Sequence, residues 1–305
     1  FPVAESTAQE MERLIALLDE LTAKTDPAAP WTHPDARALD TISFSAWLRE
    51  QSSDEEACNN IGLFVAGGML TKPAHSFSTL QALLMASSAG SFSNLVDENF
   101  ILDRRVAGGM QQVSERMAAE LGEDVVLGAP VRTLRWNAEG PSVTAEADGV
   151  TVHARYAIMA VPPNLYSRVS FDPPLPRRQH QMHQHVSLGL VIKVHAVYSK
   201  PFWREAGLSG TCFGAHELVQ EVYDNTNHED SRGTLVGFVS DEKADAMFEL
   251  SADERRQAIL ESISGYLGEE ALTPEVYYES DWGSEEWTRG AYAASDDLRG
   301  LHRYA

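Results

Sequence analysis

The sequence is poor in cysteine and lacks glycine-rich nucleotide motifs. Cys58 and Cys212 are the only cysteines among 305 residues, so they form neither a disulfide framework nor a cysteine-based metal site. This scarcity favours a reducing compartment, the cytoplasm, over secretion. No Gly-x-Gly triplet occurs in the chain, which excludes a dinucleotide fingerprint within it, and no Walker loop is present either. The serine-hydrolase elbow Gly-x-Ser-x-Gly and the zincin motif are missing too.

Positive charge and long apolar runs are also scarce. The chain has 24 basic and 45 acidic residues, and its formal net charge is -21. Such a chain repels nucleic acid and anionic membranes and attracts small cations, although acidity that serves solubility alone is the alternative. No apolar run reaches the roughly 18 residues that a membrane-spanning helix requires, and no signal peptide is recognisable. We therefore expect no nucleic-acid partner and no membrane.

Length and composition allow a large core. Hydrophobic residues make up 43% of the 305 residues, which suggests two domains as a first expectation. The sequence starts with Phe1 rather than methionine and stops at Ala305 without a closing element. We expect the chain to be a fragment of a longer protein. The sequence leaves its oligomeric state open, a homodimer included.

The order of the expected elements indicates two interleaved domains. Helical spacing of apolar residues predicts helices at 5–24, 45–50, 55–70, 78–88 and 111–121. Short strands separated by turns predict a β-meander at 125–127, 131–136, 142–147, 151–155 and 157–161. Further strands are expected at 186–198, 218–224, 234–239 and 276–279, with a helix at 251–267 that begins in a capping box of Ser251 and Glu254. This order favours an α+β or α/β fold of two interleaved domains over one doubly wound sheet.

The segment from Asp281 to Tyr292 concentrates large aromatic rings among small residues. Trp282, Trp287 and Tyr292 lie beside Gly290 and Ala291. A flat ligand that passes close to the backbone would explain this composition. A surface strand whose aromatic rings close the edge of the core would explain it equally well.

Two charged residues occur inside apolar strands, and each allows two interpretations. Lys193 lies in Gly-Leu-Val-Ile-Lys-Val, where it could extend its ammonium to water from a sheet edge or be held at a reactive centre. Strand alternation places Val219, Glu221 and Tyr223 on one face. The Glu221 carboxylate is either exposed to solvent or, if it lines a pocket, a partner for a cationic ligand.

Three histidines, His180, His183 and His185, raise the question of a metal site. Their spacing differs from that of a helical metal pair, and no carboxylate or cysteine lies between them. We therefore predict a polar surface connector and no bound metal.

Taken together, these features resemble the flavin-dependent amine oxidases, the monoamine oxidase family. The resemblance is spread over most of the chain, and it is carried by residues 108–116, 129–131, 160–163, 171–176, 189–193 and 282–292. Within the family the sequence is most similar to the actinobacterial putrescine oxidases, through residues 55–64, 67–73 and 219–227.

The resemblance implies a role for each candidate cofactor residue. Lys193 would hold a water against the flavin, and Trp282 would pack beside its ring system. Tyr292 would form one wall of an aromatic cage for the amine. Ala291 stands where some relatives have the cysteine that bonds the flavin, so the FAD is expected to be non-covalent. The backbone of Val131 would contact the adenine.

For the substrate, the resemblance implies that Glu221 binds the far ammonium of a diamine and that Phe64 lines the pocket. The implied reaction is FAD-dependent oxidative deamination of a primary diamine, putrescine, with O2 as the final acceptor and with aminoaldehyde, ammonia and hydrogen peroxide as products. A monoamine or polyamine oxidase of the same family is one alternative. A non-enzymatic acidic binding module is another.

The resemblance also suggests a division of the chain. Residues 1–98 would form the helical part and residues 176–284 the mixed-sheet part of a substrate domain. Residues 99–175 would form the middle of an FAD-binding domain with the β-meander, and residues 285–305 would begin its C-terminal part. Because the nucleotide-binding unit of the family has no counterpart in this chain, we expect the polypeptide alone not to hold FAD tightly.

Overall fold

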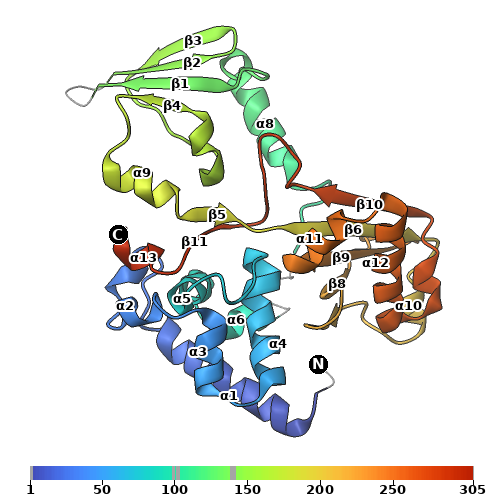
Figure 1. The fold of residues 1–305 in the computed structure, drawn as a ribbon. Helices are drawn as coiled ribbons and strands as arrows, with labels where there is room; N and C mark the ends of the chain where they lie inside the picture. Colours follow the sequence, from blue (N-terminus) through green and yellow to red (C-terminus); the bar gives the residue numbers. More distant parts are fainter. Residues whose placement is uncertain (1–2, 98–99, 101–103, 138–141, 305) are drawn as a thin grey trace. The chain divides into compact units, whose positions relative to one another are not determined.

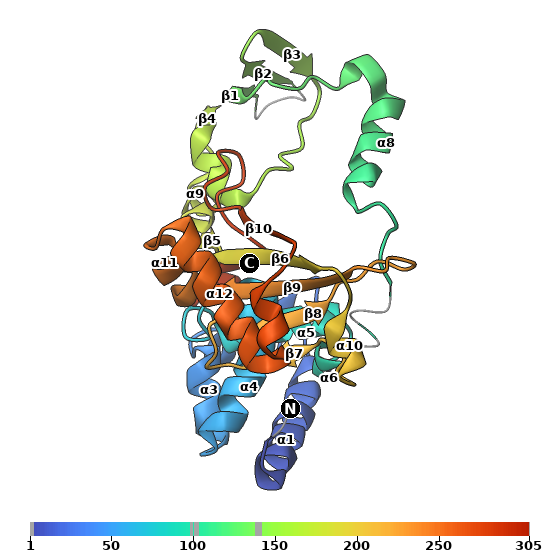
Figure 2. The same cartoon turned by 90° about the vertical axis from the view of Figure 1, so that its right-hand side faces the viewer.

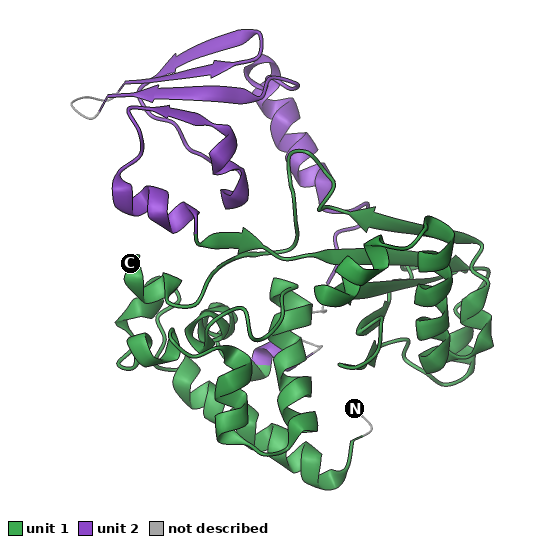
Figure 3. Ribbon diagram, in the orientation of Figure 1, with its two compact units in different colours: residues 1–93, 185–305 green, residues 94–184 purple. Residues whose placement is uncertain are grey.

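The computed structural model describes residues 3–97, 100, 104–137 and 142–304, which form two compact units. The first unit combines the beginning and the end of the chain, residues 1–93 and 185–305, and the second consists of residues 94–184 (Figure 3). Helix α6 (Phe92–Val96) leads from the first unit into the second. The finer assignment of these parts to substrate and FAD-binding domains stays a prediction.

The first half of unit 1 is helical. It contains α1 (Glu5–Thr22), α2 (Ala36–Leu39), α3 (Phe44–Gln51), α4 (Glu55–Val65) and α5 (Thr79–Ser88). Helix α4 packs against α1 and α3, and its axis continues as a π-helical turn, η2 (Ala66–Leu70). Ser43, Asp54 and Ser78 cap α3, α4 and α5 by accepting a backbone N–H in the first turn, as the sequence of each helix start favours.

The second half of unit 1 contains an antiparallel sheet in the order β10-β6-β9-β8-β7. Its strands are β6 (Val191–Tyr198), β7 (Cys212–Phe213), β8 (Glu221–Asp224), β9 (Gly233–Ser240) and β10 (Val276–Asp281). Helices α11 (Glu242–Phe248) and α12 (Ala252–Leu267) lie over one face, as Figure 1 and Figure 2 show from two directions. A separate two-stranded ribbon joins β5 (Val186–Leu188) to β11 (Ala294–Asp296), and the short helices α10 (Phe202–Glu205) and α13 (Gly300–Arg303) complete the unit.

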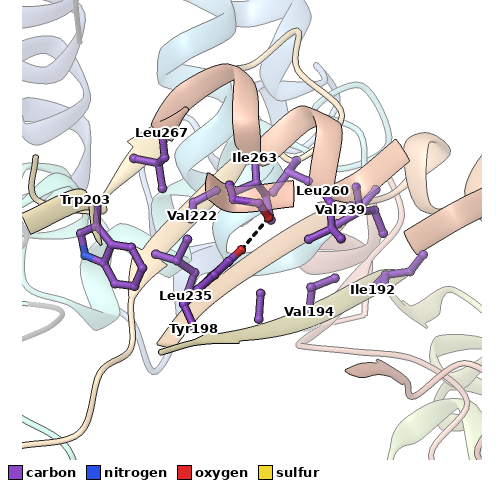
Figure 4. Packing of buried hydrophobic residues seen from close by; sticks show 14 of the residues in the cluster. Ile192, Val194, Tyr198, Trp203, Val222, Leu235, Val239, Leu260, Ile263 and Leu267 are labelled. Atoms are coloured by element: carbon purple, nitrogen blue, oxygen red, sulfur yellow. Dashed lines mark hydrogen bonds between the residues drawn. The ribbon is translucent and has the colours of Figure 1, made fainter. Parts of the chain in front are cut away.

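The core of this half lies between the sheet and α12 (Figure 4). Alternate residues of β6 point into it, and they meet Ile259, Leu260 and Ile263 of the helix. Among these residues of β6, Tyr198 carries a phenol, and its hydroxyl donates to the Ala271 carbonyl at 2.9 Å. The expected capping box at the start of α12 is confirmed, because Ser251 and Glu254 each accept the other's backbone N–H.

Unit 2 has its own four-stranded sheet in the order β3-β2-β1-β4. The strands are β1 (Val131–Trp136), β2 (Val143–Ala147), β3 (Val150–Ala154) and β4 (Ser170–Asp172). The first three form the expected meander, whereas β4 was not predicted and pairs parallel to β1. Helices α8 (Gln111–Leu121) and α9 (Arg177–His183) belong to this unit too.

Two of the predicted meander strands are wrong. Residues 125–127 and 157–161 are not strands, and Leu127 and Ile158 are 86% and 92% exposed. Within the described sheet β1 already pairs with β2 on one side and with β4 on the other. Neither segment pairs with any of the four described strands, so neither gains the ladder hydrogen bonds that define a strand.

The single long strand predicted at 186–198 is also wrong, because it is divided between Leu188 and Val191. A Cβ at Gly189 would lie 2.1 Å from the Thr71 hydroxyl, and the Leu190 N–H donates to the Thr71 carbonyl at 3.0 Å. At this point the backbone bonds to Thr71 instead of a neighbouring strand. Only a glycine allows so close an approach.

None of the helices in the described part of the chain combines the length and the apolar character that crossing a bilayer demands.

Candidate active site

One row of side chains crosses the sheet of unit 1 on the face turned away from α12. Strand register places Lys193 opposite Phe238, Phe238 opposite Glu221, and Glu221 opposite Phe213. Residues directly opposite each other on neighbouring strands point to the same face. The register therefore brings Lys193 and Glu221, two of the predicted site residues, onto one surface with aromatic rings between and beside them.

Glu221 is the most unusual member of this row because it is buried and forms no ion pair with any residue in the described ranges. Its residue is 6% exposed, and one carboxyl oxygen, Oε2, accepts a hydrogen bond from the Tyr223 hydroxyl at 2.8 Å. The other oxygen, Oε1, is buried and has no hydrogen-bond partner among the described residues. Burial raises the pKa of this carboxyl to about 7, although the bond from Tyr223 acts in the opposite direction.

Aromatic rings connect the predicted residues Phe64 and Tyr292 through the row. The ring of Phe64 lies 6.0 Å from that of Phe213, and Phe213 lies 5.6 Å from Tyr223. Tyr223 is 6.1 Å from Phe238, and Phe238 is 5.9 Å from Tyr292. Most of these contacts are edge-to-face, the arrangement that aromatic quadrupoles favour.

Lys193 completes this arrangement by lying over an aromatic face. Its Nζ atom is 5.5 Å from the centre of the Phe238 ring, which is a cation–π contact. Lys193 is partly exposed but does not lie at a sheet edge, because β6 lies between β10 and β9.

The two tyrosines of the site stay protonated over a wide pH range. Burial raises the pKa of the Tyr292 hydroxyl, and the nearby Glu221 charge adds to the effect. The pKa of Tyr223 is raised by the same causes and by its hydrogen bond to Glu221. Both phenols are therefore neutral walls that can donate a hydrogen bond.

The segment from Asp281 to Tyr292 is a fixed turn rather than a surface strand. The Gly290 N–H donates to the Trp282 carbonyl at 3.1 Å, and the Ala291 N–H donates to the Gly189 carbonyl at 3.1 Å. The Thr71 hydroxyl donates to the Ala291 carbonyl. Trp282 and Tyr292 nevertheless keep 46% and 44% of their surface exposed, whereas Ala291 is buried.

Thr71 is a site residue that the sequence did not single out. It lies at the end of η2 in a left-handed conformation, with a φ of 50°, and it is fully buried. Its hydroxyl and its carbonyl hold the two backbone segments that carry Tyr292 and Lys193. A signal existed, because Thr71 follows Gly67 and Gly68 in a stretch that carries the family resemblance.

Val131 is the one predicted site residue outside unit 1. It is the first residue of β1 in unit 2 and is partly exposed. Its proposed contact with adenine stays a prediction.

Neither the histidines nor the cysteines form a metal centre in the described part of the chain. Residues of the types that bind metals do not gather there in groups of three or more. His180 and His183 belong to α9, where the His183 ring packs edge-on against Tyr166 at 4.4 Å. Cys58 is buried and Cys212 is half-buried, and both are free thiols.

The fold of this chain has close counterparts among known proteins. The model of the flavin containing amine oxidoreductases matches residues 3–305, and the chain belongs to this family.

Particular relatives narrow the similarity further. The chain is 72% identical over its whole length to a putrescine oxidase of Kocuria rosea, and 32% identical over 90% of its length to the human amine oxidase [flavin-containing] B. It spans 66% of the length of the first of these proteins and 53% of the second.

Solved structures lead to the same group. A putrescine oxidase described as wild type bound to putrescine is 71% identical and has a TM-score of 0.97. The match covers the whole of this chain and 68% of the putrescine oxidase chain. Cyclohexylamine oxidase from Brevibacterium oxydans IH-35A is 26% identical and has a TM-score of 0.87. That match covers 97% of this chain and 65% of the cyclohexylamine oxidase chain.

Proposed function

We propose that the protein containing this chain deaminates a primary diamine, putrescine, oxidatively to an aminoaldehyde, ammonia and hydrogen peroxide, with FAD as cofactor and O2 as acceptor. The observation that carries the proposal is the buried Oε1 of Glu221, which has no hydrogen-bond partner among the described residues and lies within the aromatic row. The name of the Kocuria rosea relative and the putrescine complex of a solved relative support this choice of substrate.

A diamine fits the chemistry of the row. A buried carboxylate is costly unless a cation pairs with it, and the far ammonium of a diamine supplies that cation. Lys193 and Glu221 are separated by two strand spacings, which places their Cα atoms roughly 10 Å apart. A four-carbon diamine, about 6 Å between its nitrogens by standard bond geometry, can pair with Glu221 and still present its reacting carbon near Lys193.

The exposed aromatic surfaces of the 281–292 turn fit a flat ring system. Trp282 and Tyr292 belong to a turn held by hydrogen bonds, and their half-exposed rings offer apolar area to such a ligand. Ala291 has no thiol, so the flavin would be held without a covalent bond. When bound, the flavin accepts a hydride from the carbon that bears the amine and is reoxidised by O2.

The side chains of this chain would bind, orient and desolvate the amine. Glu221 fixes the far end of the diamine, while Tyr292 and Phe238 form apolar walls that exclude water. Lys193 would orient a water molecule beside the flavin. Phe64 would close the pocket beyond Phe213.

The substitution Glu221→Gln in the complete, flavin-loaded enzyme tests the proposal. It keeps the shape of the side chain and removes the charge that pairs with the far ammonium. Losing a desolvated charged contact costs about 2–5 kcal/mol, so kcat/KM for putrescine should fall by about 30-fold or more, mainly through KM. The value for butylamine, which has no second ammonium, should change little.

Glu279→Gln is the matched control. Glu279 lies in the same sheet and pairs with Arg255 at 2.6 Å. Its loss should lower stability without changing the ratio of diamine to monoamine turnover. An equal effect of Glu221→Gln on putrescine and butylamine would contradict the diamine assignment and favour a monoamine oxidase of the same family.

We also propose a cytoplasmic location, which the two free thiols support. A homodimer remains compatible with this function, and its test is the mass of the complete enzyme in solution.

A further inference from the structure

Two consecutive glycines, Gly67 and Gly68, lie in the π-helical turn that ends helix α4. A π-turn contains one extra residue and is frequent at functional sites. Each glycine in a helical segment also costs about 1 kcal/mol relative to alanine. Neither has a positive φ, so backbone conformation does not require glycine at these positions.

The space above the two glycines is taken by the Glu221 carboxylate. A Cβ at Gly68 would lie 3.3 Å from Oε1 and 3.7 Å from Oε2, and its nearest neighbours are all atoms of the Glu221 carboxyl group. A Cβ at Gly67 would lie 3.3 Å from Oε1 and only 2.7 Å from the Cδ1 atom of Leu63. The unpaired oxygen of Glu221 therefore rests against bare backbone.

The electrostatics of the turn also favour a cation beside this carboxylate. The turn is the C-terminal end of the helix that starts at Glu55, where the helix dipole is negative. A negative helix end opposes ionisation of Glu221, in the same direction as its burial, and both effects are relieved when an ammonium binds.

We propose that Gly67 and Gly68 determine substrate length, because their missing side chains let the Glu221 carboxylate retract against the helix turn. This inference rests on the proposed role of Glu221. The far ammonium of the diamine follows the carboxylate, so the position of the glycine turn sets how long a diamine the site accepts. Gly68 is in this sense a positioning residue that acts through Glu221.

Gly68→Ala is the sharpest test, since the new methyl group meets only the carboxylate. At 3.3 Å the carboxylate must give by a few tenths of an ångström, away from the turn and toward the aromatic row. Each methylene lengthens an extended diamine by roughly 1.3 Å. The shortened site should therefore disfavour cadaverine most, putrescine less and 1,3-diaminopropane least.

The experiment measures kcat and KM of the complete, flavin-loaded enzyme for these three diamines and for butylamine. We expect KM for cadaverine to rise about tenfold or more in Gly68→Ala, with kcat nearly unchanged and butylamine unaffected. Gly62→Ala is the control on the same helix, because its Cβ would make only ordinary contacts with Leu48 and Ala74 at 3.7 and 3.8 Å. Gly62→Ala should keep the native length profile.

A double-mutant cycle shows whether Gly68 acts through Glu221. In the Glu221→Gln background, which binds the far ammonium poorly, Gly68→Ala should have little further effect on the diamine profile. A Gly68→Ala enzyme that matches Gly62→Ala, while Glu221→Gln loses diamine selectivity, would overturn the length proposal and leave the function intact. If Glu221→Gln also keeps the selectivity for diamines, the proposed function itself would be refuted.

If Gly68→Ala folds poorly, a second variant still tests the proposal. In Glu221→Asp the carboxylate is one methylene shorter and clears the new methyl group. The pair Gly68→Ala/Glu221→Asp should then fold and show the length profile of Glu221→Asp alone. A pair that still fails to fold, or differs from Glu221→Asp, would place the conflict elsewhere and overturn the proposal.

Discussion

Glu221 combines three properties that rarely occur in one carboxyl group. It is buried, one of its oxygens lacks a partner among the described residues, and its pKa is raised to about 7. Each property is unfavourable for the fold alone, because a desolvated carboxyl group gains nothing from its charge. A bound cation offsets the cost of all three, which is typical of a group selected for recognition.

The raised pKa leads to a pH dependence that is specific to diamines. Below pH 7 Glu221 in the free enzyme is mostly neutral and cannot pair with the far ammonium. KM for putrescine should therefore rise about tenfold for each pH unit below 7. The ratio of kcat/KM for putrescine to that for butylamine, measured from pH 5.5 to 8.5, isolates this effect from ionisation of the reacting amine. The ratio should be independent of pH in Glu221→Gln.

The same shift predicts the sign of a stability change. The folded pKa of about 7 lies above the ordinary value of 4.5, so the unfolded chain releases this proton first. The contribution of Glu221 to stability is greatest below pH 4.5 and is lost as pH rises toward 7. Without substrate, Glu221→Gln should raise the melting temperature relative to the wild type at pH 8 but not at pH 4. A rise of equal size at both values would contradict the shifted pKa.

At the scale of elements, the turn that ends α4 organises two other segments. Thr71, directly after η2, bonds through its hydroxyl to Ala291 and through its carbonyl to Leu190. One segment carries Tyr292 and the other leads into β6 with Lys193. The helix end therefore positions both the aromatic wall and the lysine.

Thr71→Val should remove the hydroxyl contact to Ala291 with little change of shape. The unfolding free energy should fall by about 1–3 kcal/mol, because the Ala291 carbonyl loses a buried donor. Since Tyr292 is the next residue, kcat for putrescine should fall as well.

Thr22→Val is the matched control for that substitution. Thr22 is buried and donates to the Leu18 carbonyl at 2.7 Å, within α1. Its substitution should lower the melting temperature but leave kcat and the flavin absorption spectrum unchanged. Identical kinetics for the two variants would show that Thr71 supports the fold without positioning the wall.

At the scale of the whole chain, the net charge of -21 favours the approach of a dication. Salt screens this attraction, and the effect on a doubly charged amine is larger than on a singly charged one. Raising NaCl from 20 to 500 mM should lower kcat/KM for putrescine more steeply than for butylamine. Parallel slopes would show that the acidity serves solubility alone.

Much of the local structure could be predicted from the sequence. Ser251 and Glu254 predict the start of α12, and helical spacing predicts α1 and α3 to within a few residues. These features depend on neighbours in the chain, which the sequence lists directly. The strands predicted at 125–127 and 157–161 were wrong because a strand exists only where another strand pairs with it.

By itself, the sequence determined the residue types of the site, the family resemblance that links them, and the alternation that turns Glu221 and Tyr223 to one face. Only the tertiary structure decided that Lys193, Phe238 and Glu221 form one row, since strand register is set between distant segments. It also decided that the Glu221 carboxyl is buried against Gly67 and Gly68. Burial and pKa depend on what surrounds a group in space, and packing alone supplies those surroundings.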